Sequence, residues 1–136
     1  MVHFACHGYS DPTNPTDSHL LLQKRGESGM VPDQLKVSTL LDTNVVSRAW
    51  IAYLSACSTA EVKDQSLRNE SLKITNGFLA AGFSHVVGSL WSADDEVCVD
   101  MAASFYEALV RRRASSADPN KAVAEAVRDA TLQIRA

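Results

Sequence analysis

His7 and Cys57 are the residues of this 136-residue chain whose types and surroundings best suit catalysis. A thiol with an ordinary pKa of ~8.5 is mostly protonated at neutral pH, and a nearby imidazole can accept its proton. The thiolate can then attack a carbonyl carbon, and the imidazolium can protonate the leaving amine. Gly8 permits an open backbone turn, whose N–H could stabilise the developing oxyanion together with that of Cys57. This combination predicts a nucleophilic cysteine site.

The elements that must position these residues follow from the apolar pattern. Short apolar runs predict strands at residues 2–6, 50–56 and 85–90. The second and third runs have little polar alternation, as expected of strands that are covered on both faces. Longer stretches of helical period predict helices at residues 31–41, 70–81, 94–113 and 119–135. This alternation predicts an α/β fold with a mostly parallel sheet.

The predicted topology brings the two candidate residues to one edge of the sheet. In an open parallel sheet, catalytic groups gather beyond the carboxyl ends of the strands. His7 follows the first predicted strand and Cys57 follows the second, so neighbouring strands ~4.8 Å apart would present both side chains to one substrate. After the third strand, Trp91 is either a packing residue at the strand boundary or a wall of the cleft, and Asp94 or Asp95 could line a pocket for a basic side chain. The simpler interpretation is that these carboxylates complement the dipole of the following helix.

Local signals place the element boundaries. Pro32 is suited to the first position of a helix, Gly82 to a helix C-terminus, and Asp118 with the proline after it to a helix start. Residues 19–23 and 29–31 predict a peripheral hairpin around residues 24–28. The polar loops at residues 10–18 and 60–68 flank the predicted cleft and are candidates for substrate selection or gating.

Other interpretations apply to the cysteines and the nearby histidine. Taken alone, Cys57 could be a buried structural thiol, which is a common role of free cysteine. Cys6 points to the opposite strand face from His7 and is predicted to lie in the core, as is Cys98. A zinc site built from Cys6, His7 and Cys57 would close poorly, so no metal is predicted. His3 shares the face of His7 and is either an accessory residue or simply packed.

The composition excludes several classes of protein. The 16 acidic and 13 basic residues leave a net charge of −3, which argues against a nucleic-acid binder. No apolar run approaches the ~20 residues that span a bilayer, so no membrane association is predicted. Three widely spaced cysteines do not form a disulfide framework, and glycine-rich phosphate loops are absent. We therefore expect a cytoplasmic protein without a nucleotide cofactor.

Several segments carry a resemblance to a known family. Residues 3–8 read His-Phe-Ala-Cys-His-Gly, and residues 53–60 read Tyr-Leu-Ser-Ala-Cys-Ser-Thr-Ala. Together with residues 76–95 and 105–109, they resemble the CHAT family, caspase-like domains associated with tetratricopeptide repeats. The resemblance implies a three-layer caspase-like fold over residues 1–136. The strands that normally precede the His-Gly segment are missing, so we expect the C-terminal part of a larger domain or protein.

The resemblance also implies a function. It makes His7 and Cys57 the catalytic dyad of a cysteine endopeptidase that acts on protein or peptide substrates and needs no cofactor. It further implies control by an adjacent tetratricopeptide-repeat module or another regulatory domain. One alternative is a scaffold module that retains the fold without turnover. Another is a thiol redox domain, in which Cys6 would have to serve as the resolving cysteine.

Overall fold

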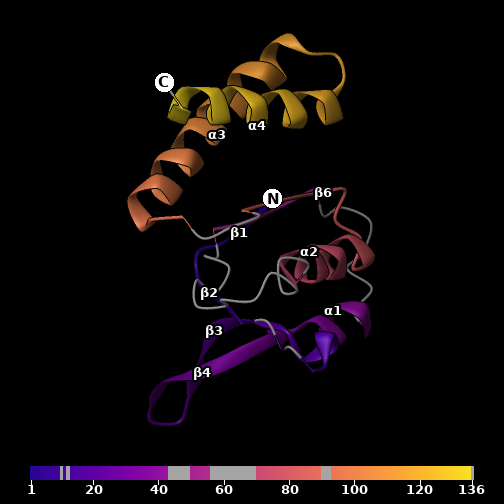
Figure 1. Ribbon diagram of the computed structural model, residues 1–136, viewed down its shortest axis with the longest axis vertical. Helices are drawn as coiled ribbons and strands as arrows, with labels where there is room; N and C mark the ends of the chain where they lie inside the picture. Colours follow the sequence, from indigo (N-terminus) through magenta and orange to yellow (C-terminus); the bar gives the residue numbers. More distant parts are fainter. Residues whose placement is uncertain (10, 12, 43–49, 56–69, 90–92, 136) are drawn as a thin grey trace. The chain divides into compact units, whose positions relative to one another are not determined.

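The computed structural model describes residues 1–9, 11, 13–42, 50–55, 70–89 and 93–135 (Figure 1). The chain divides into two compact units, Met1–Ser92 and Ala93–Ala136. The described strands form two three-stranded sheets, both in the first unit, whereas the described part of the second unit is a pair of helices. The predicted α/β class is confirmed at this level.

The first sheet is parallel and consists of three short strands. β1 (Val2–Phe4), β5 (Ile51–Leu54) and β6 (His85–Gly88) lie in the order β1-β5-β6. All four residues of β5 are buried, as expected of a central strand whose sequence lacks polar alternation. The three predicted strands and the adjacency of the first two are confirmed, although each strand ends earlier than the apolar run suggests.

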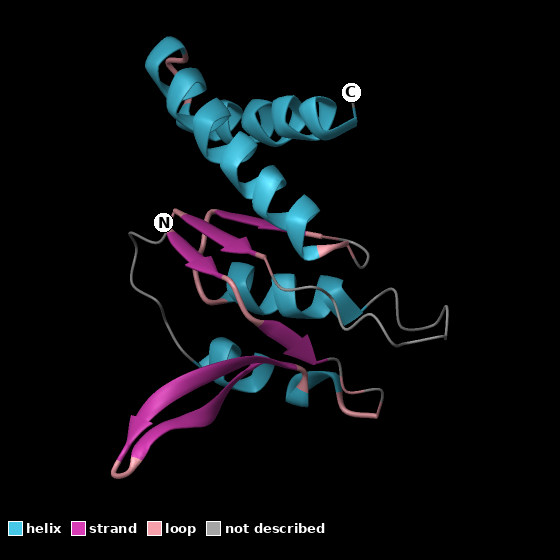
Figure 2. Cartoon of the chain, turned by 90° about the vertical axis from the view of Figure 1, so that its left-hand side faces the viewer, coloured by secondary structure: helices cyan, strands magenta, loops and turns pink. Residues whose placement is uncertain are grey.

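α2 (Glu70–Ala80) packs against this sheet and supplies much of its core (Figure 2). Phe78 is 1% exposed, and its ring centroid lies 5.1 Å from that of Phe4 and 5.6 Å from that of Phe83. The buried cluster joins α2, β5, α1 and β3 and consists of Leu20, Val37, Leu40, Ala52, Leu54, Ile74, Phe78, Ala81 and Phe83. One apolar core therefore supports both sheets of the first unit.

Gly82 ends α2 as the sequence predicts. Its φ of 102° lies in the region that favours glycine. The Gly82 N–H donates to the Leu79 carbonyl at 3.0 Å, and the Phe83 N–H donates to the Phe78 carbonyl at 3.2 Å. These two bonds, with the contact between the two phenylalanine rings, form a Schellman motif. The motif fixes the direction in which the chain leaves the helix toward β6.

The second sheet is antiparallel and was predicted only in part. β2 (His7–Tyr9), β3 (His19–Gly26) and β4 (Gly29–Lys36) lie in the order β2-β3-β4. The expected hairpin is confirmed, and it is longer than predicted because its two main strands have eight residues each. Its tight turn pairs Gly26 with Gly29. Strand β2 was not predicted.

The helix predicted over residues 31–41 is wrong in its first half. Residues 31–36 belong to β4, and the helix that follows is the short α1 (Val37–Asp42). Pro32 was expected at a helix start but lies in β4 opposite Gln23. Because β4 is at the edge of the sheet, a residue without an N–H donor is tolerated there. The turn and the long pairing with β3 override the helical period of the sequence.

The second unit consists of α3 (Asp95–Ser115) and α4 (Pro119–Arg135), and both predicted helices are confirmed. Asp118 caps α4 by accepting a hydrogen bond from the Asn120 N–H at 2.9 Å. Arg112 joins the two helices by donating two bonds to the Asp129 carboxylate, at 2.8 and 3.0 Å. None of the helices within the described ranges has the length and apolar character needed to cross a bilayer.

Candidate active site

The candidate site lies where the chain leaves β1 and β5. The two strands run parallel, and their register pairs Phe4 with Leu54 at the last position of each strand. The segments that follow therefore leave the sheet at the same edge, beyond its carboxyl end. Sequence reasoning predicted this adjacency, and it is the structural basis for considering His7 and Cys57 together.

His7 was predicted to lie directly after the first strand, but it is the first residue of β2. The chain leaves the parallel sheet after Phe4, and His7 pairs with Leu21 of β3 in the antiparallel sheet. Cys6, just before it, packs against the buried core, and burial raises the pKa of its thiol. The predicted core position of Cys6 is thereby confirmed. His7 is exposed.

Gly8 is buried within β2, opposite the fully buried Leu20. It therefore lies in an extended strand and not in the open turn that we expected. The strand arises because Leu20 anchors β3 in the core and β3 offers β2 an edge for pairing. The role of its N–H toward an oxyanion stays a prediction. Cys57 and Trp91 lie outside the described residues.

A pair of side chains that sequence reasoning did not connect bridges the two strands. The Nε2 atom of His3 in β1 and the Oγ atom of Ser55, directly after β5, are 2.7 Å apart and hydrogen-bonded. The His3 ring also packs edge-on against Tyr53, with centroids 5.0 Å apart. To find this pair from the sequence, one would have to know that His3 is opposite Tyr53 in the register. Side chains two residues apart lie on the same face of a strand, which places Ser55 on the face of His3.

The whole chain matches one family. The family model described as the CHAT domain matches residues 1–136. The chain belongs to the CHAT domain family. This is a caspase-like peptidase family, so the mixed α/β fold and its parallel sheet agree with the membership. No curated protein and no solved structure has a significant match to the chain.

The described part of the loop after β2 is extensively hydrogen-bonded in this CHAT domain. The Asp11 carboxylate accepts bonds from the Thr13 N–H, the Thr13 hydroxyl and the Asn14 N–H, all at 2.9 Å. These bonds hold the pKa of Asp11 below its ordinary value. The Asp11 N–H donates to the hydroxyl of the buried Ser18 at 3.0 Å. These bonds hold the described part of this loop in place, and its role in substrate selection or gating stays a prediction. The other predicted loop, at residues 60–68, lies outside the described residues.

Two further predicted site residues of the CHAT domain lie in its second unit. Asp94 is the N-cap residue of α3, and Asp95 lies in the first turn of that helix. Both positions agree with the simpler interpretation that these carboxylates complement the helix dipole. Their role in a substrate pocket stays a prediction. Among the described residues, no three His, Cys, Asp or Glu side chains form a group that could hold a metal ion.

Proposed function

We propose that this CHAT domain is a cysteine endopeptidase that hydrolyses peptide bonds in protein substrates through a dyad of His7 and Cys57. The register of β1 and β5 carries the proposal. Phe4 and Leu54 are paired neighbours, and each candidate residue stands three positions beyond one of them. The two segments therefore start from adjacent parallel strands, which lie ~4.8 Å apart, and reach the candidate residues after the same number of positions. Both residues could then act on one substrate.

In the proposed reaction, His7 accepts the thiol proton of Cys57, and the thiolate attacks the carbonyl carbon of the scissile bond. The backbone N–H groups of Gly8 and Cys57 stabilise the oxyanion. When the carbon–nitrogen bond breaks, His7 donates its proton to the leaving amine. Water, deprotonated by His7, then hydrolyses the thioester and restores the thiol. The exposure of His7 supports this role because the imidazole must reach both the substrate and water.

We further propose the three-layer caspase-like arrangement for the fold of this domain. Trp91, Asp94 and Asp95 are the proposed residues of the substrate pocket. An adjacent tetratricopeptide-repeat or other sensor module would control the activity in the cytoplasm, and the reaction needs no cofactor. Family membership supports these assignments.

A scaffold module that binds proteins without turnover is the second candidate. One observation favours it: His7 belongs to the antiparallel sheet, whereas β5 belongs to the parallel sheet. The backbone of His7 is thus fixed by pairing with Leu21 and not by a continuation of β1. If β1 had continued as far as His7, its pairing with β5 would have fixed the position of His7 relative to β5.

Alkylation of the three cysteines separates the two candidates. For a peptidase, iodoacetamide should label Cys57 about tenfold faster than Cys98 at pH 7, because lowering a thiol pKa from ~8.5 to ~7 increases its thiolate fraction by about that factor. His7→Ala should remove most of this advantage. A peptide library should be cleaved by the wild-type chain and not by Cys57→Ala.

Equal labelling of all three cysteines, with no effect of His7→Ala, would contradict the dyad and favour the scaffold. Mild oxidation provides a check on the redox alternative. A disulfide between Cys6 and Cys57 would indicate a thiol redox function. Mass spectrometry of the digested protein identifies both the alkylated sites and any disulfide.

A further inference from the structure

His3 is held from two sides on the face of the parallel sheet that is opposite the main core. Its Nε2 atom is hydrogen-bonded to the Ser55 hydroxyl at 2.7 Å, and its ring packs edge-on against the buried Tyr53. The alternating residues Phe4 and Leu54 pack against the core that includes α2. The histidine is thus an exposed residue whose ring is nonetheless oriented by two neighbours.

The bond joins the two segments that lead to the candidate dyad. His3 is opposite Tyr53 in the register, so Ser55 stands one two-residue step further along the same face. In the sequence, His7 follows His3 by four positions and Cys57 follows Ser55 by two. The contact therefore lies next to the last paired residues of β1 and β5, Phe4 and Leu54.

We propose that His3 and Ser55 are positioning residues of the endopeptidase: their hydrogen bond fixes the start of the Cys57 segment against β1 and so sets how closely the thiol approaches His7. This inference rests on the proposed function. The need for such a bond follows from the length of β1, because three residues form only a short ladder with β5. A displacement of ~1 Å in a catalytic pair can reduce the rate by about 10²-fold.

The hydroxyl is suited to this role in either tautomer of the histidine. A neutral ring with an unprotonated Nε2 accepts the hydroxyl proton, and a ring that carries a proton on Nε2 donates it to the Ser55 oxygen. The contact can therefore form with either tautomer of the ring. Substitution of Ser55 by Thr preserves the hydroxyl, whereas substitution by Ala removes it with little change in volume.

The test measures alkylation of Cys57 by iodoacetamide in the full chain, with Cys98 as the internal reference. At pH 7, Ser55→Ala and His3→Ala should slow the labelling of Cys57 by about three- to tenfold, the effect expected for loss of one hydrogen bond. Ser55→Thr should restore the wild-type rate. Ser115→Ala, which removes an exposed hydroxyl at the end of α3, is the matched control and should have no effect.

Two further measurements separate positioning from a general loss of structure. One pH unit above the ordinary thiol pKa of ~8.5, where every variant holds mostly thiolate, the labelling rates should converge. In a His7→Ala background, Ser55→Ala should cause no additional slowing, because both changes act on the same step. Thermal unfolding and the rate at Cys98 show that the variants remain folded.

The outcomes distinguish this inference from the proposed function. If the wild-type chain labels Cys57 quickly, His7→Ala slows it and Ser55→Ala does not, the dyad stands and the positioning role is wrong. Slowing that is equal at both pH values, or that adds to the effect of His7→Ala, also overturns the positioning role. If the wild-type chain labels Cys57 no faster than Cys98, the proposed function itself fails.

Discussion

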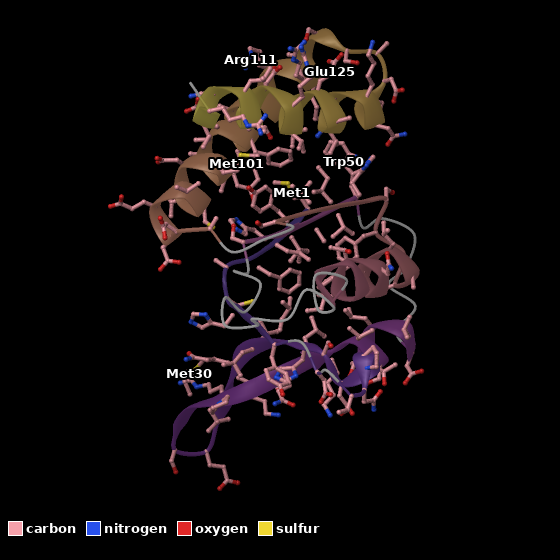
Figure 3. All side chains as sticks on the ribbon, viewed as in Figure 1. Met1, Met30, Trp50, Met101, Arg111 and Glu125 are labelled. Atoms are coloured by element: carbon pink, nitrogen blue, oxygen red, sulfur yellow. The ribbon has the colours of Figure 1, made fainter. Side chains whose placement is uncertain are left out.

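The two sheets of the first unit differ in what surrounds them. In the parallel sheet, all four residues of β5 are buried. In the antiparallel sheet, β4 has no buried residue, and Met30 is 62% exposed near the hairpin turn (Figure 3). The parallel strands are short and are held mainly by the core, whereas the hairpin strands are long and are held mainly by their own ladder.

The comparison bears directly on the candidate site. The segment that leads to Cys57 leaves the buried parallel sheet, whereas His7 begins a strand of the antiparallel sheet. The relative placement of the two residues therefore depends on how the sheets are joined through the chain from Phe4 to His7 and through the shared core around Leu20. Changes in that core should alter the site more than changes in the hairpin do.

The largest contrast is expected between core and hairpin side chains. Phe78→Ala should lower the free energy of unfolding by about 3–5 kcal/mol, because it empties the centre of the cluster under the parallel sheet. Met30→Ala should change it by less than about 0.5 kcal/mol, because that side chain is mostly in water. Urea denaturation followed by circular dichroism measures both. Equal effects would show that the hairpin, too, is a packed part of the core.

A smaller effect is expected at the end of α2. Gly82→Ala should cost about 1–2 kcal/mol, because alanine is strained at a φ of 102°. Gly82→Asn should cost less, since asparagine tolerates positive φ better than alanine does. The two variants are compared by thermal unfolding. Were alanine no worse than asparagine, the Schellman motif would not be the source of the stability, and the helix could end in another way.

The smallest effect is expected in the loop that joins β2 to β3, and it should depend on pH. The bonds to its carboxylate lower the folded-state pKa of Asp11, so they stabilise the folded chain above the unfolded-state pKa of ~3.9. This contribution is lost as the pH falls through the lower, folded-state value. Asp11→Ala should therefore lower the melting temperature at neutral pH, and the difference should disappear in strong acid.

Thr13→Val is the matched variant for this loop, because it removes only one of the three donors to the Asp11 carboxylate. It should cause a smaller decrease than Asp11→Ala, with the same dependence on pH. A decrease that persists unchanged in acid would mean that the carboxylate does not stabilise the loop through its charge.

Sequence patterns predicted the parts of the fold that rest on local signals. The signal for each of these parts lies in residues close together in the chain. Examples are the apolar run at β5, the glycine at position 82 that ends α2, and Asp118, which caps α4. The same reasoning placed Cys6 in the core through the alternation of strand faces. It also predicted that the first two parallel strands would be adjacent, which is the basis of the candidate site.

The errors share one cause, which is strand pairing that the residue pattern of a single segment does not specify. Residues 31–36 have a helical period but form a strand, because β3 offers eight residues to pair with. His7 was predicted to lie directly after the first strand, yet pairing with Leu21 places it in the other sheet.

The amino-acid sequence by itself determined which residues are apolar, where the helices end and which family the chain belongs to, because those properties depend on residue type and near neighbours. Only the tertiary structure decided that His7 joins the antiparallel sheet and that His3 meets Ser55 across two strands. Strand pairing connects backbone groups far apart in the chain, and no local pattern specifies the partner.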